Sequence, residues 1–196
     1  MDSTAEALAR LRRFASPVNS ELPPVDVALG ELRALLKDAG VDFRIVGGVA
    51  VVHHGYLRTT EDVDVLVAAG ARPRIDAQLA AHGFEQASAS RLRHVASGVR
   101  VDLLVAGEPL PRGAGVYPSP ESLGTSPRDA AVVSLGGLVT LKLAARRHRD
   151  LADVVELLKR LDEAHYLEVE ASVDRSLRPE LAQLRRDALD ELGHER

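Results

Sequence analysis

The stretch from residue 43 to residue 67 constrains the fold more than any other part of the sequence. Two short runs rich in apolar residues, FRIV at 43–46 and VDVLV at 63–67, have the length and composition of strands. Between them, the pair Gly47-Gly48 predicts a tight turn into a short helix over 48–55. We therefore expect a strand–helix–strand unit at the centre of the molecule.

Helical spacing of apolar residues flanks this unit. We expect helices over 3–15, 24–39 and 71–82, followed by strands over 91–97 and 99–105 that are joined at Ser97-Gly98. Residues 116–129 are expected to add at most one short strand. Further helices are expected over 134–147, 150–162, 164–173 and 178–192.

This order of elements predicts an α+β fold with a small mixed β-sheet. We expect a helical N-terminal extension at residues 1–40, a sheet core at 41–125, and a helical C-terminal half at 126–196 that packs on the core. Thr125-Ser126-Pro127 marks the change between the last two regions. Both regions are small, so they are not expected to fold independently.

Composition excludes several classes of protein. The 196 residues include no cysteine, which excludes disulfides, thiolate metal sites and a cysteine nucleophile, and favours a cytoplasmic location. No apolar run approaches the roughly 20 residues that span a bilayer, so no membrane partner is expected. The net charge of −4 gives the whole molecule no general attraction to nucleic acid.

Three aspartates are the main candidates for chemistry. Asp62 and Asp64 are two residues apart in a predicted strand, so their carboxylates project from the same face. Asp102 lies in the apolar run VRVDLLV, where a lone carboxylate is costly unless it is paired or metal-bound. An isolated Asp-x-Asp is common without any metal, but three convergent carboxylates are typical of two-metal phosphoryl or nucleotidyl transfer.

Other residues are suited to binding a phosphate group. The Gly47-Gly48 turn would let backbone N–H groups approach a phosphate closely. Arg58 could donate to a phosphate or orient a carboxylate. Lys142 lies in an apolar helical stretch, where it is either a triphosphate ligand or a snorkelling side chain.

The basic and acidic residues after Lys142 permit two interpretations. Arg146 and Arg149 would share a helical face with Lys142, at positions i+4 and i+7. Asp150 is either a site residue or the N-cap of the next helix. The neighbouring His53 and His54 would point from different faces of a helix, which makes a shared ion unexpected.

These motifs in combination resemble the nucleotidyltransferase superfamily with the DNA polymerase β-like fold. The similarity is greatest to its minimal bacterial branch, which includes abortive-infection-type toxins and small antibiotic nucleotidyltransferases. It rests on Gly47-Gly48, on G-x-x-R-x-T-x-D-x-D from Gly55 to Asp64, and on Asp102, within roughly residues 42–160. Gly48 departs from the family pattern, because many members have Ser there.

The resemblance implies a Mg²⁺-dependent enzyme that transfers a nucleoside monophosphate from an NTP to an acceptor hydroxyl. The acceptor would be tRNA or another RNA, with the chain acting as a toxin whose partner is an antitoxin protein. One alternative is an antibiotic nucleotidyltransferase acting on a small hydroxylated molecule. Another is a non-catalytic nucleotide-binding or interaction module.

The resemblance also implies roles for individual residues. Two Mg²⁺ ions would be held by Asp62, Asp64 and Asp102, which would form the catalytic set. Nucleotide binding would fall to Gly47, Gly48, Arg58 and Lys142, with Arg146 and Asp150 as further candidates.

Overall fold

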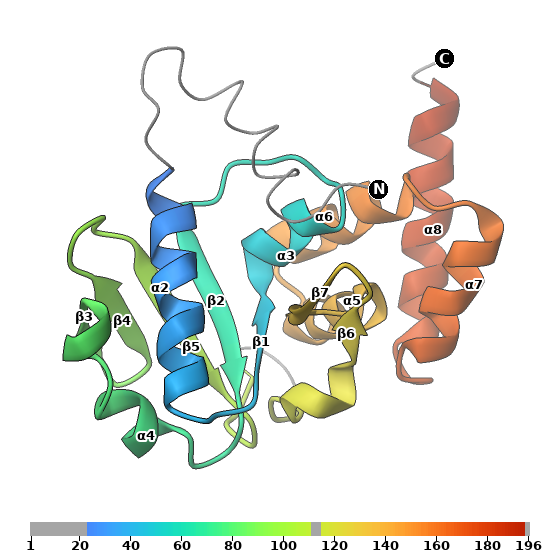
Figure 1. The fold of residues 1–196 in the computed structure, drawn as a ribbon. Coiled ribbons are helices and arrows are strands. Elements are labelled where there is room, and N and C mark those ends of the chain that lie inside the picture. Colours follow the sequence, from blue (N-terminus) through green and yellow to red (C-terminus); the bar gives the residue numbers. More distant parts are fainter. Residues whose placement is uncertain (1–22, 111–114, 195–196) are drawn as a thin grey trace.

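A seven-stranded mixed sheet, with the order β3-β4-β5-β2-β1-β7-β6, organises the chain (Figure 1). The computed structural model describes residues 23–110 and 115–194. The helix expected at 3–15 lies outside these residues. The strands are β1 Phe43–Val46, β2 Asp62–Val67, β3 Phe84–Ser88, β4 Arg91–His94, β5 Arg100–Val105, β6 Thr125–Ser126 and β7 Asp129–Val133.

Helices cover one side of the sheet and form the C-terminal half, which confirms the α+β prediction. They are α2 Pro24–Asp38, α3 Gly47–His53, α4 Arg72–Asp76, α5 Leu135–Ala145, α6 His148–Leu158, α7 Glu163–Ser172 and α8 Arg178–His194, with the short 3₁₀ helices η1 Ala80–His82 and η2 Pro120–Leu123. Within the described ranges, no helix combines the length and apolar character needed to cross a membrane.

The two faces of the central strands differ in chemistry. Alternate side chains such as Ile45, Val65 and Leu103 are buried, and α2 packs over this face (Figure 1). The opposite face of β2 and β5 carries the aspartates. β2 pairs in parallel with β5 and antiparallel with β1, so the strand–helix–strand unit lies at the centre of the sheet, as the sequence predicts.

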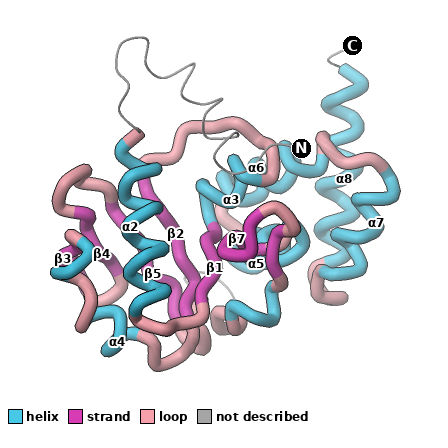
Figure 2. The backbone as a smooth tube through the Cα atoms, in the orientation of Figure 1, coloured by secondary structure: helices cyan, strands magenta, loops and turns pink. Residues whose placement is uncertain are grey.

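A second hydrophobic cluster holds the C-terminal helices together. α6 packs on α8, and α5 packs on both α6 and α7. Figure 2 shows α7 and α8 on the side of the molecule away from β3 and β4. α5 contributes Leu138 and Leu141 to the sheet core, and Val139 and Leu143 to the helical cluster. This helix therefore joins the two halves.

The proposed division at residue 125 cuts β6 in this architecture. The β6–β7 hairpin belongs to the sheet, because Ile45 of β1 pairs with Val132 of β7. We propose that the division between core and helical half instead falls at Ser134. The hydroxyl of Ser134 caps α5 by accepting a hydrogen bond from the Gly137 N–H at 3.0 Å.

Two elements differ from the sequence prediction. The single helix expected over 71–82 is divided into α4 and η1, because hydrogen bonds between them shift to a tighter i to i+3 spacing. β3 was not expected from the sequence, because its residues FEQAS do not alternate between apolar and polar. In the structure, only Phe84 of the five is buried. It forms the outer strand of the hairpin with β4.

Candidate active site

Asp64 and Asp102 lie directly opposite each other on β2 and β5. Adjacent strands are about 4.8 Å apart, so the two carboxylates leave the same face at neighbouring positions. Asp62 precedes Asp64 by two residues and shares this face. The strand register therefore brings together the three acids that the sequence singles out.

Gly47 and Gly48 make room for the middle acid. Val46 pairs with Asp64, which places the glycine turn beside that carboxylate. Gly47 has φ +59°, and a Cβ there would overlap with the Asp64 side chain. A Cβ on Gly48 would overlap with the hydroxyl of Thr60. The hydroxyl of Thr60 thus occupies the space that a side chain at position 48 would need.

Asp64 is in an unfavourable electrostatic environment. Burial and the nearby charges of Asp62 and Asp102 raise its pKa from 3.8 to about 6. Lys142 and a hydrogen bond from the backbone N–H of Gly48 oppose this rise. The Gly48 N–H thus contacts a carboxylate here. A cation bound between the acids would relieve their repulsion.

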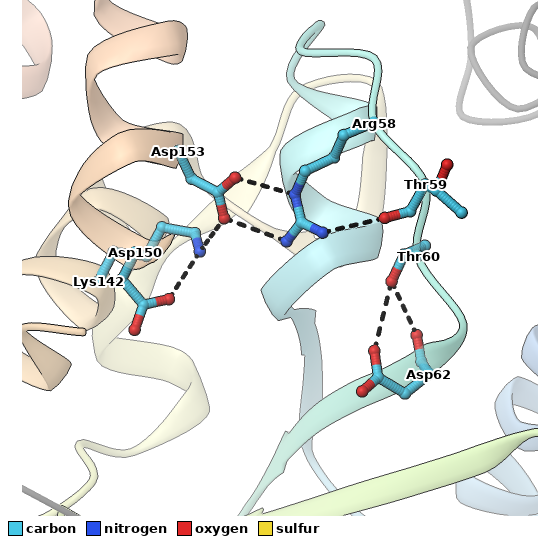
Figure 3. Close-up of polar contacts among 7 residues, drawn as sticks. All are labelled: Arg58, Thr59, Thr60, Asp62, Lys142, Asp150 and Asp153. Atoms are coloured by element: carbon cyan, nitrogen blue, oxygen red, sulfur yellow. Dashed lines mark hydrogen bonds and ion pairs between the residues drawn. The ribbon is translucent and has the colours of Figure 1, made fainter. Parts of the chain in front are cut away.

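The other two acids have donors within the chain. Asp102 Oδ1 accepts a hydrogen bond from Arg91 Nε at 2.6 Å. Asp62 Oδ1 accepts one from the Thr60 hydroxyl at 3.4 Å (Figure 3). In residues 23–110 and 115–194, no three His, Cys, Asp or Glu side chains are arranged as a metal-ligand set. Carboxylate oxygens are ligands that Mg²⁺ prefers. The side chains of Asp62, Asp64 and Asp102 would nevertheless have to turn toward a common point to bind one ion.

Arg58 is directed at an acid in the C-terminal half. Its Nε lies 2.9 Å from Asp153 Oδ1, and its Nη2 donates to Asp153 Oδ2 at 3.1 Å (Figure 3). Of the two roles considered from the sequence, this forked contact matches the orienting of a carboxylate. It ties the segment before β2 to helix α6.

Lys142 lies at the other side of Asp153. Its Nζ donates to Asp153 Oδ2 at 2.7 Å and to Asp150 Oδ1 at 3.0 Å (Figure 3). The lysine side chain is only 5% exposed and the Asp153 side chain only 3%. Lys142 is therefore a buried, paired cation near Asp64, and the snorkelling interpretation is wrong.

The helical face expected to link Lys142 with Arg146 and Arg149 is absent. Arg146 ends α5 in a left-handed conformation with φ 51°, so Arg149 falls in the next helix. Arg146 instead pairs with Glu180 at 3.1 Å. The N-cap position of α6 is taken by Arg147, so Asp150 lies inside the first turn of that helix, and the capping interpretation is wrong.

A pocket of about 80 Å³, open to solvent, adjoins these groups, and we call it the site pocket. Asp64, Lys142 and Asp150 contribute polar groups to its wall, whereas Leu104, Leu138 and Leu141 are among its apolar residues. Tyr117 and Arg147 also line it, and the sequence analysis missed both. Tyr117 stands directly before Pro118 in a loop, where no periodic pattern marks an aromatic residue as part of a site.

Comparison with known proteins gives remote structural similarity alone. No protein-family model and no curated protein matches the sequence. The solved antibiotic-resistance factor ANT(2″)-Ia is 14% identical with a TM-score of 0.49, and the match covers 89% of this chain and 100% of that one. An antigenic nucleotidyltransferase-like protein from Paracoccidioides brasiliensis is 16% identical with a TM-score of 0.46, covering 87% and 95%.

A third solved structure is the STING-associated CdnE c-di-GMP synthase from Capnocytophaga granulosa. It is 16% identical with a TM-score of 0.33, and the match covers 96% of this chain and 68% of that one. Identities of 14–16% and TM-scores below 0.5 do not assign a function to this chain.

Replacing Asp64 by Asn is expected to stabilise the metal-free protein at pH 8 by about 1–3 kcal/mol. The raised pKa of about 6 means that ionised Asp64 costs stability above that pH, and that this cost vanishes as the pH falls toward 3.8. The gain should therefore disappear near pH 4. Urea unfolding in EDTA at both pH values measures it. Asp42→Asn, at an exposed acid, is the control, and a destabilised Asp64→Asn at pH 8 would contradict the repulsion.

Replacing Lys142 by Ala is expected to lower the free energy of unfolding by about 3 kcal/mol, because it leaves the buried Asp153 with one cation fewer. Lys142→Arg keeps the charge and should lose less. Lys37→Ala, at an exposed lysine on α2, serves as the control in urea unfolding. Equal stability of Lys142→Ala and Lys37→Ala would show that the buried ion pairs contribute nothing.

Proposed function

We propose that the chain is a Mg²⁺-dependent nucleotidyltransferase that moves a nucleoside monophosphate from an NTP to an acceptor hydroxyl. The observation that carries the proposal is the register pairing of Asp64 with Asp102, with Asp62 on the same face and the site pocket alongside. Without a cation, three acids in this arrangement repel each other and destabilise the fold. This repulsion contributes nothing to a sheet with a purely structural role, so it favours a functional role for the three acids.

Each group has a role in this scheme. Asp62, Asp64 and Asp102 would hold Mg²⁺, which when bound supplies Lewis-acid stabilisation of the transferred phosphoryl group. Asp102 would also accept the proton of the acceptor hydroxyl. Lys142, held by Asp150 and Asp153, would present a fixed positive charge to the triphosphate.

The glycine turn and Arg58 would support nucleotide binding from the sheet side. The absent side chains at Gly47 and Gly48 leave room for the Asp64 carboxylate and the Thr60 hydroxyl, so Gly47 and Asp64 both line the site pocket, where a phosphate would bind. Arg58 would act through Asp153, which it fixes by a forked contact, so that Lys142 keeps its position. Arg146 lies at the C-terminal end of α5 in a left-handed conformation and is paired with Glu180, which leaves it no role in this scheme.

The site pocket is suited to a nucleobase. Its apolar wall of leucines provides a surface for a flat ring, and Tyr117 adds an aromatic face at the rim. The backbone of Tyr117 is held by two hydrogen bonds of 2.9 Å: its N–H donates to the Glu108 carbonyl, and its carbonyl accepts from the Gly107 N–H. Arg147, which also lines the pocket, would add a donor for the ribose or base edge.

RNA is the acceptor that we favour. Arg91, Arg93 and Arg100 are exposed on the open face of β4 and β5, next to the carboxylates. Such a basic strip suits a phosphate backbone. In the cell, such an RNA-modifying enzyme would act as a toxin, and its partner would be an antitoxin protein. The antibiotic alternative is supported by Asp150 in the pocket wall, which would attract a cationic aminoglycoside.

Incubation with radiolabelled NTPs and Mg²⁺, with either purified tRNA or an aminoglycoside as acceptor, tests the proposal. We expect label to move to the RNA with wild-type protein, and Asp64→Asn to transfer at least about a hundredfold more slowly. Asp42→Asn is the matched control. Label on the aminoglycoside alone would establish the antibiotic alternative. NTP binding without transfer to either acceptor would establish a non-catalytic module.

Replacing Tyr117 by Ala is expected to weaken NTP binding by about 1–3 kcal/mol, the usual contribution of one aromatic side chain stacked on a base. Tyr117→Phe should bind nearly normally, because the ring is kept. Isothermal titration with NTP and Mg²⁺ measures both variants. Inorganic triphosphate is the control ligand, since it has no base and should bind all three proteins equally. Weaker triphosphate binding by Tyr117→Ala would show that the variant disturbs the whole pocket.

A further inference from the structure

Arg91 lies directly across from the third acid of the candidate site. It is the register partner of Asp102 in the antiparallel β4–β5 pair, and its Nε is 2.6 Å from Asp102 Oδ1. The arginine side chain is 44% exposed and the Asp102 side chain 27%, so the contact is accessible to solvent and to ions. The charge of Asp62 also attracts this guanidinium.

The next arginine on the same strand face behaves differently. Arg93 lies opposite Arg100 on β5 and pairs with Glu85 of β3, with Nη2 2.6 Å from Oε1. Its side chain is 47% exposed, nearly the same as that of Arg91. Two arginines of similar exposure thus lie on one strand, and only Arg91 contacts a carboxylate of the site.

We propose that Arg91 is the internal counter-ion of Asp102 and competes with the divalent cation for that carboxylate. The inference rests on the proposed function, because it assigns Asp102 to the metal site. In the metal-free protein the guanidinium neutralises Asp102, which turns Oδ1 toward β4. Asp102 would have to give up this contact with Arg91 in order to bind a divalent ion. Arg91 is therefore a positioning residue that sets the metal affinity of the site.

The arrangement of charges explains why competition follows. Asp62, Asp64 and Asp102 share one sheet face, and each negative charge raises the cost of the others. A guanidinium on Asp102 lowers this cost before any metal arrives, so part of the driving force for metal binding is already used. The guanidinium also places a positive charge next to the position that a divalent ion would take, and this charge would repel the ion.

Titration of Mn²⁺ against the full-length protein, followed by the EPR signal of the free ion, tests the inference without any NTP. We expect Arg91→Met to bind Mn²⁺ about threefold to tenfold more tightly than wild type, the effect of removing one partly exposed cation beside a divalent ion. Arg93→Met removes a cation from the same strand face and should change the affinity by less than about twofold. Arg91→Lys should fall between wild type and Arg91→Met.

A second measurement uses the metal-free protein. Arg91→Met should lower the melting temperature in EDTA more than Arg93→Met does, and Mn²⁺ should restore more of the loss, because the uncompensated acids then gain a cation. Equal Mn²⁺ affinity of the two Met variants, or weaker binding by Arg91→Met, would overturn the inference while leaving the metal site intact. If Asp64→Asn binds Mn²⁺ as tightly as the wild type does, the metal site is overturned, and the proposed function with it.

Discussion

Repulsion between Asp64 and Asp102 is the constraint on which the site depends. The parallel pairing of β2 and β5 fixes the two acids side by side, and no rotation of the backbone can separate them without losing the central register. The surrounding chain supplies compensation at short range: the Gly48 N–H at Asp64, Arg91 at Asp102, and Lys142 nearby. The polar face of the sheet is in this sense organised around one unfavourable pair.

A second electrostatic unit joins the sheet to the C-terminal helices. Asp153 of α6 receives Arg58 from the segment before β2 and Lys142 from α5 (Figure 3). Because the Asp153 side chain is only 3% exposed, the two cations are required to offset its desolvation. The position of Lys142 relative to Asp64 therefore depends on residues from three separate parts of the sequence.

Sequence reasoning was most successful where a local pattern carries the information. The alternation in β2 and β5 placed the three acids on strands, and the glycine pair placed the turn from β1 into α3. It failed where the deciding contact is distant in sequence: Arg58 and Asp153 are 95 residues apart, and nothing local indicates that they meet. The end of α5 was placed two residues late, at 147, because a left-handed conformation at Arg146 has no sequence signature.

The sharing of α5 between both hydrophobic clusters limits how the molecule can move. Leu138 and Leu141 are fixed in the sheet core, while Val139 and Leu143 are fixed in the helical cluster. A hinge between the halves would have to expose one of these sets to water. The parts of the site pocket that come from the sheet and from α5 are therefore held at a fixed spacing. The size of molecule that this protein admits is consequently decided by the packing of its leucines.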